Sequence, residues 1–154
     1  MKSLRPLLLD SPPEDWKLDG VPDYRVEQVR NWVFEKGVLD WEEMTNLPAS
    51  LRAELSEFWD SVPMEKVRAQ GSKDTTQKFL WRLRDGQLIE SVLIPATEGT
   101  KGVRSSRLTL CVSTQVGCAL GCKFCASGLD GLKRNLTTGE IIGQVLLARN
   151  EAGR

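Results

Sequence analysis

Three cysteines within eight residues constrain this chain more than any other feature of its sequence. Cys118, Cys122 and Cys125 follow the pattern C-x-x-x-C-x-x-C. Three thiolates this close together can hold three irons of a [4Fe–4S] cluster, whose usual ligand set is four cysteines. One iron would then stay open, and an open coordination site on a metal is where chemistry takes place. We therefore expect a loop that wraps a metal group, with Gly117 and Gly121 permitting its sharp turns.

The composition of the chain indicates its cellular compartment and the kind of chemistry its cysteines support. The chain has 154 residues and no histidine, and its four cysteines all lie between Cys111 and Cys125. Such clustering favours metal or redox chemistry over a disulfide framework. No run approaches the roughly 20 apolar residues of a membrane span, and the first ten residues do not resemble a secretory signal. We therefore expect a cytoplasmic protein with no membrane association.

Charge is unevenly distributed along the chain. Residues 1–100 carry 13 basic and 18 acidic residues, a net of −5, whereas residues 101–154 carry 8 basic and 3 acidic residues, a net of +5. The basic part is the part with the cysteines. It would attract the phosphates of RNA, although solvated loop charges explain the same pattern.

Local signals predict a small helical module followed by strands. Asp23 is a candidate cap for a helix that ends at Gly37. Asp40 is a candidate cap for a short turn, and Pro48 opens another helix. We expect most tryptophans of this module to be core residues. From about Met64 the period changes to two, and Asp85-Gly86 predicts a hairpin between strands 76–84 and 87–94.

Glu90 is a carboxylate on one of these predicted strands. Leu88, Glu90, Val92 and Ile94 share one face of the strand 87–94. Two explanations stay open from the pattern alone: an edge-strand glutamate that reaches water, or an acid in a semi-buried functional site.

The second half is expected to begin an α/β barrel. A polar linker spans 95–107, and a strand at 108–113 leads into the cysteine loop. Thr137 and Glu140 form a capping box for a helix at 141–149, which we expect to bury Ile142, Val145 and Leu146. The expected fold is α+β or α/β, with a helical accessory domain at 1–62, a β-hairpin and linker at 63–103, and a partial barrel at 104–154.

The residues around the cysteines also resemble a known family. LCVSTQVGCALGCKFC at 110–125 and RNLTTGEIIGQV at 134–145 look like the RlmN/Cfr family of radical S-adenosylmethionine (SAM) RNA methyltransferases. YRVEQVRNW at 24–32 and EMT at 43–45 resemble the N-terminal domain of that family. The resemblance implies methylation of carbon 2 of adenine, a position too electron-poor for ordinary methyl transfer, in 23S rRNA and in tRNA, through a methylcysteine intermediate.

The same resemblance implies roles for individual residues. Cys118, Cys122 and Cys125 would hold the [4Fe–4S] cluster, with SAM on its open iron. Phe124 would lie near the adenine of SAM, although a plain hydrophobic lid is equally compatible. Glu90 matches the proton acceptor, and Cys111 matches the cysteine that resolves a protein–RNA crosslink through a transient disulfide. A buried strand cysteine and a fourth cluster ligand are the alternatives for Cys111.

The resemblance further implies an external electron donor such as flavodoxin or ferredoxin, and a monomer. The methyl-carrying cysteine would lie beyond Arg154, so we expect the chain to be the N-terminal part of a longer enzyme. Two other hypotheses remain: a radical SAM oxidoreductase or maturase, and a non-catalytic zinc-binding RNA module that uses all four cysteines. The residues leave open the choice between ribosomal and transfer RNA and between carbon 2 and carbon 8.

Overall fold

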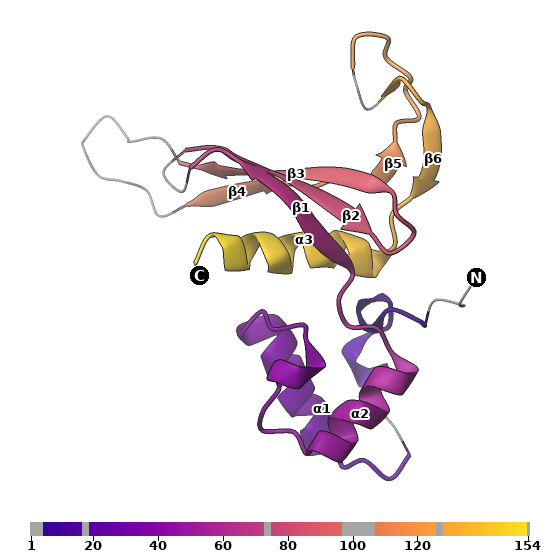
Figure 1. Cartoon of the computed structure of the whole chain (residues 1–154), viewed down its shortest axis with the longest axis vertical. Coiled ribbons are helices and arrows are strands. Elements are labelled where there is room, and N and C mark those ends of the chain that lie inside the picture. Colours follow the sequence, from indigo (N-terminus) through magenta and orange to yellow (C-terminus); the bar gives the residue numbers. More distant parts are fainter. Residues whose placement is uncertain (1–4, 17–18, 73–74, 97–106, 126–127, 154) are drawn as a thin grey trace. The chain divides into compact units, whose positions relative to one another are not determined.

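The computed structural model describes residues 5–16, 19–72, 75–96, 107–125 and 128–153. It contains two compact units, Met1–Pro63 with Thr137–Asn150, and Met64–Leu136 with Glu151–Arg154 (Figure 1). The first unit is helical and the second is built from antiparallel strands, which confirms a mixed fold of helices and sheets. Among the described helices, none combines the length and the apolar composition needed to cross a membrane. The predicted domain boundaries at 62 and 103 stay predictions, and position 103 lies outside the described residues.

The helical unit begins with short turns and two helices. Helix α1 spans Asp23–Arg30 and continues as a π-helical turn at Asn31–Glu35. The predicted cap was displaced by one residue, because Pro22 is the N-cap and Asp23 lies in the first helical turn. Gly37 follows the helical segment with φ +69°, as a stop glycine should. Three 3₁₀ turns at Leu8–Asp10, Pro13–Asp15 and Trp41–Glu43 and helix α2 at Ala49–Phe58 complete this part.

Two further expectations for this unit are confirmed. The Asp40 side chain caps its turn by accepting a hydrogen bond of 2.9 Å from the backbone N–H of Glu42. Trp16 and Trp41 are buried core residues. Trp16 also stacks on Phe34, with ring centroids 5.7 Å apart.

Helix α3, at Thr138–Glu151, belongs to the core of the helical unit although it follows the cysteines in the chain. The capping box is confirmed, because the Glu140 N–H donates to the Thr137 hydroxyl at 3.2 Å and the Thr137 N–H donates to the Glu140 carboxylate at 2.9 Å. Leu146 is 5% exposed within the core cluster. Val145 was wrongly predicted to be buried and is 47% exposed, because it lies off the face that packs into the unit.

The second unit contains a four-stranded antiparallel sheet in the order β1-β2-β3-β4. Its strands are β1 (Met64–Gln70), β2 (Gln77–Leu83), β3 (Leu88–Pro95) and β4 (Leu108–Cys111). The predicted β2–β3 hairpin is confirmed, with Asp85-Gly86 in the turn and Gly86 at φ +83°. Strand β4 is antiparallel to β3, and the backbone bond from Ala96 N to Arg107 O, 3.0 Å long, extends their pairing.

One face of this sheet is buried and the other is open. The buried face carries Phe79 and Trp81 of β2 with Ile89, Ser91 and Leu93 of β3. The buried indole N–H of Trp81 has a hydrogen-bond partner within this face, because Nε1–H donates to the Ser91 hydroxyl at 3.0 Å. The alternate residues of β3 therefore share the opposite face, where Leu88 is 50% and Ile94 42% exposed. Glu90 stands on this open face.

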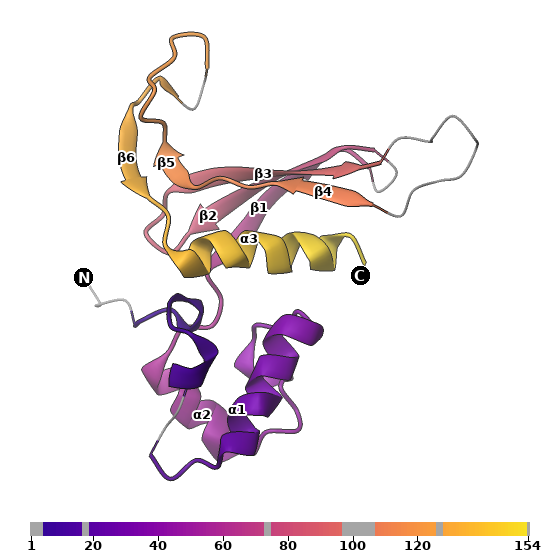
Figure 2. The ribbon, with the colours of Figure 1, turned by 180° about the vertical axis from the view of Figure 1, so that it is seen from behind.

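A second, smaller sheet pairs β5 (Gln115–Gly117) with β6 (Leu132–Asn135) in antiparallel register. Figure 2 shows these two strands as a separate ribbon beside the four-stranded sheet. This pair of strands was not predicted from the sequence. It carries the cysteine loop at its end.

Candidate functional site

The three motif cysteines all lie in the connection between β5 and β6. Cys118 follows β5 directly, and Cys122 and Cys125 lie further along the loop. The two strands are thus the legs of one hairpin whose tip holds the cysteines. Val116, in the middle of β5, is 3% exposed and anchors that leg in the unit.

The two ends of the loop approach each other closely at two glycines. Gly117 has φ +76°, and a β-carbon at that position would lie 1.9 Å from the carbonyl oxygen of Gly131. The same carbonyl accepts a hydrogen bond of 3.2 Å from the Cys118 N–H. Only glycine fits both the backbone conformation and the close approach. Gly121 also has positive φ, +55°, as the expected sharp turns require.

The donor chemistry of the loop suits an iron–sulfur cluster. All four cysteines are free thiols, and those of the motif are partly exposed. The backbone bond from Cys125 N to Cys122 O, 3.1 Å long, closes one turn that brings these two residues near each other. Within the part of the chain that the structure describes, no three cysteine or carboxylate side chains converge as a metal site. Cluster binding would therefore require the loop to draw its thiols together.

Glu90 and Cys111 lie on the same face of the four-stranded sheet. Cys111 is the cross-strand partner of Val92, two residues beyond Glu90 on β3. Directly opposed residues of antiparallel strands share a face, so Glu90 and Cys111 are diagonal neighbours. Cys111 is exposed, which makes the alternative of a buried strand cysteine wrong.

The surroundings of Glu90 are open and polar. Its side chain is 50% exposed and forms an ion pair of 2.9 Å with Lys78 of β2. Its backbone carbonyl accepts a hydrogen bond of 2.7 Å from the Ser113 hydroxyl, which follows β4. The structure therefore ties the chain leading to the cysteine loop to the backbone of Glu90.

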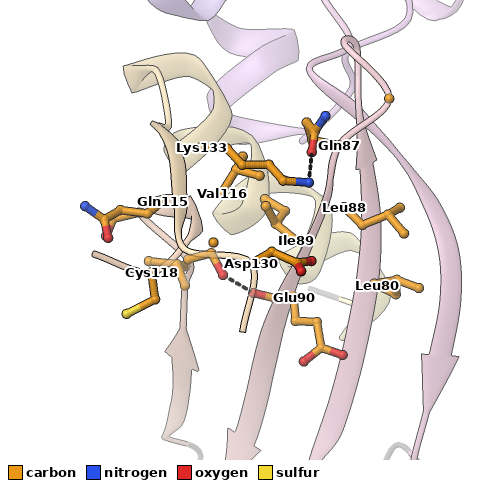
Figure 3. A pocket seen from close by; sticks show the side chains of 15 residues that line it. Leu80, Gln87, Leu88, Ile89, Glu90, Gln115, Val116, Cys118, Asp130 and Lys133 are labelled. Atoms are coloured by element: carbon orange, nitrogen blue, oxygen red, sulfur yellow. Dashed lines mark hydrogen bonds between the residues drawn. The ribbon is translucent and has the colours of Figure 1, made fainter. Parts of the chain in front are cut away.

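A pocket of about 730 Å³ connects these features. Figure 3 shows Glu90 and Leu88 of β3 on one flank, with Cys118 and Gln115 on the other. The rest of the lining comes from Leu80 of β2, the end of the β2–β3 hairpin, the segment 112–114, β5, Asp130 and Lys133. Its volume lies within the range of small-ligand sites. The pocket brings one of the motif cysteines and the candidate proton acceptor to a common space.

Large apolar side chains are exposed on the cysteine loop. Leu120 is 84%, Phe124 93% and Leu129 69% exposed. Exposed apolar groups gathered in one place usually mark an interaction site. The expected place of Phe124 beside the adenine of SAM stays a prediction.

Several polar residues of the pocket were not predicted from the sequence. Gln87 and Lys133 both line it, and the Lys133 ammonium donates to the Gln87 amide oxygen at 3.1 Å (Figure 3). Ser113 and Asp130 were missed as well. A signal was present, because glycines at 117 and 131 lie on either side of the three cysteines and indicate a narrow hairpin base.

Comparisons with known proteins agree with the motif. Residues 18–60 match the model of the ribosomal RNA large subunit methyltransferase N-terminal domain. A probable dual-specificity RNA methyltransferase RlmN of Akkermansia muciniphila is 54% identical over 135 residues, which are 88% of this chain and 38% of that protein. The corresponding protein of Thermotoga neapolitana is 43% identical and matches 100% of this chain and 43% of its own length.

A solved structure gives the same result. A radical SAM methyltransferase from Sphaerobacter thermophilus superposes with a TM-score of 0.81 at 42% identity, over 97% of this chain and 44% of the other. The chain thus spans less than half the length of these relatives. Its motif, its fold and its relatives agree, and the chain belongs to the RlmN/Cfr family of radical SAM RNA methyltransferases.

Proposed function

We propose that this chain is the cluster-binding part of an enzyme that methylates carbon 2 of adenine in 23S rRNA and in tRNA through a methylcysteine intermediate. The observation that carries the proposal is the shared sheet face of Glu90 and Cys111 next to the pocket that also holds Cys118. The 54% identical relative, named as a probable dual-specificity RNA methyltransferase, supports RNA methylation as the reaction class. The protein would act in the cytoplasm as a monomer, with flavodoxin or ferredoxin as electron donor.

Cys118, Cys122 and Cys125 would hold a [4Fe–4S] cluster, and Phe124 would cover the adenine of SAM. Bound in this way, the cluster supplies one electron for reductive cleavage of SAM. The protein's own task is to position the groups and to keep water away from them. The exposed apolar side chains of the loop suit that second task.

Glu90 would accept the proton that leaves carbon 2 of the adenine. Its carboxylate starts in an ion pair of 2.9 Å with Lys78 and is half exposed, so it is accessible from the open face of the sheet. Cys111 would then attack the sulfur of the methyl-carrying cysteine outside this chain. That step forms a disulfide and breaks the carbon–sulfur bond between the carrier and the RNA. The electron pair of the broken bond stays with the methylene carbon and its adenine ring, and this carbon takes up a proton to become the methyl group of the released base. The exposed position of Cys111 leaves its thiol accessible for this attack.

The full-length protein tests the proposal after anaerobic reconstitution with iron and sulfide. We expect about four irons per chain, an electron paramagnetic resonance signal that changes with SAM, and 2-methyladenosine in RNA by mass spectrometry. Cys111→Ala should keep the cluster and accumulate a covalent RNA adduct. Glu90→Gln should lose methylation by about 100-fold or more, as loss of a general base does.

Glu65→Gln is the matched control, because Glu65 is also a strand carboxylate paired with a basic residue of β2, Arg82. Clean turnover by Cys111→Ala, or equal activity of Glu90→Gln and Glu65→Gln, would refute the assigned roles. A colourless protein with tight zinc would instead favour the non-catalytic RNA-binding module, and a reconstituted enzyme without 2-methyladenosine would favour another radical SAM reaction.

A further inference from the structure

An ion pair joins the β2–β3 hairpin to the cysteine hairpin. The Arg134 guanidinium of β6 reaches Asp85 in the β2–β3 turn, with Nε at 2.9 Å and Nη2 at 2.7 Å from the same carboxylate oxygen. Both side chains are about one third exposed, at 32% and 36%. Beside this pair, Lys133 donates to Gln87 at 3.1 Å. Two successive residues of β6 therefore hold the end of the other hairpin.

Asp85 is fixed from its own side by the turn. Its second carboxylate oxygen accepts a hydrogen bond of 3.0 Å from the Gln87 N–H. Burial alone would raise the pKa of Asp85, but the Gln87 N–H and the Arg134 guanidinium outweigh it, so the pKa lies below its ordinary value. The turn itself is closed by backbone bonds between Leu83 and Gln87 and between Gly86 and Leu83. Arg134 therefore pairs with an Asp85 carboxylate that is ionised and held in one orientation by its own turn.

The position of Arg134 connects this contact to the candidate site. Arg134 is the cross-strand partner of Val116, and β5 and β6 are the two legs of the cysteine loop. The pocket is lined from both hairpins, with Gln87 and Glu90 on one side and Cys118 and Lys133 on the other. A displacement of β6 relative to the Asp85 turn would therefore change the distance across the pocket.

We propose that Asp85 and Arg134 are positioning residues that hold the cysteine loop at a fixed distance from Glu90. They touch neither cluster nor substrate in this assignment and act through the legs of the loop. This inference rests on the proposed function, because a fixed distance between the cysteine loop and Glu90 matters only if Cys118 and Glu90 take part in the same reaction. Its first test is independent of any cluster.

Hydrogen exchange of the full-length protein without cluster gives that first test. Two backbone bonds report the closed hairpin, from Cys118 N to Gly131 O at 3.2 Å and from Leu136 N to Thr114 O at 2.8 Å. Asp85→Asn keeps an acceptor for the Gln87 N–H and removes only the charge. We expect Asp85→Asn and Arg134→Gln each to raise exchange of these amides about two- to fivefold, which is typical of a partly exposed ion pair.

The double variant decides whether the two residues act together. If both residues act through the same ion pair, the amides of the double variant Asp85→Asn with Arg134→Gln should exchange no faster than those of either single variant. Multiplicative effects would mean that the residues act independently and would overturn the inference. Glu65→Gln, which breaks an ion pair with Arg82 between strands β1 and β2, is the control and should leave both amides unchanged.

The reconstituted enzyme gives the second test. Asp85→Asn should keep the iron content of the wild type and weaken SAM binding about two- to fivefold, measured from the change of the cluster signal with SAM concentration. If Asp85→Asn exchanges faster but keeps the SAM affinity and the methylation rate of the wild type, the Asp85–Arg134 ion pair only stabilises the hairpin. That result would overturn the positioning role. A wild-type protein without cluster or 2-methyladenosine would refute the proposed function, and the exchange result would still stand.

Discussion

Truncating Leu146 tests whether helix α3 completes the core of the helical unit. The side chain is 5% exposed and lies in the core cluster with residues of α1, α2 and the N-terminal turns. Leu146→Ala removes apolar surface worth about 0.8 kcal/mol per buried methylene. The cavity left behind adds to this, and buried leucine truncations cost about 2–5 kcal/mol in total. We expect a loss of this size in the free energy of unfolding.

The contacts of α3 at both ends support that magnitude. The Gly139 N–H donates to the Asp10 carboxylate at 2.7 Å, and a β-carbon on Gly139 would lie 2.6 Å from Leu7. At the other end, the Arg149 guanidinium donates to the Phe34 carbonyl and the Asn150 amide to the Gly37 carbonyl, both at 2.6 Å. A helix bound closely at both ends cannot collapse freely into a cavity at its centre.

Urea unfolding followed by tryptophan fluorescence measures the effect. Four of the five tryptophans lie in the helical unit and the fifth, Trp81, is in the sheet, so the signal is dominated by the unit in question. Val145→Ala is the matched control on the same helix, because Val145 is 47% exposed and should cost less than about 0.5 kcal/mol. Equal midpoints for the two variants would refute the placement of α3 in the helical core.

Two further predictions concern the cysteine hairpin and its ion pair. Gly117→Ala should destabilise the chain by more than Gly86→Ala, by thermal denaturation, because both have positive φ but only a β-carbon at Gly117 meets a backbone atom within 4 Å; equal losses would show that the hairpin base opens easily. For Asp85, whose pKa is lowered in the folded state, the stabilisation is present above the ordinary value of 3.8 and lost as the pH falls through the folded pKa. Stability measured between about pH 5 and pH 2 should therefore fall less in Asp85→Asn than in the wild type, and parallel curves would contradict this.

Features that depend on neighbouring residues could be predicted from the sequence. The Asp85-Gly86 turn places the β2–β3 hairpin, and Thr137 with Glu140 places the start of α3. In each case the interacting groups lie within a few residues of one another. The preference of these residues for a turn or a helix cap therefore does not depend on distant parts of the chain, and the structure confirms both elements. The cysteine spacing is a local signal of the same kind.

Burial of a particular side chain could not be predicted in this way. Glu90 shares a stripe with Leu88 and Ile94, but that stripe is the open face, because the buried face is filled by alternate residues of β3 with Phe79 and Trp81. Val145 and Leu146 are adjacent and equally apolar, yet only Leu146 faces the core. Either residue satisfies the helical pattern, and the partner elements decide between them.

The sequence by itself determined the family, the cysteine loop, the hairpin turn and the helix cap, because each depends on residue identities over a short stretch of chain. Only the tertiary structure decided that Glu90 and Cys111 share a sheet face, that Arg134 meets Asp85, and that α3 packs with the N-terminal helices. These contacts join residues separated by 21 to more than 100 positions. Their free energy comes from burial and pairing that form only when distant segments come together, so no local pattern encodes them.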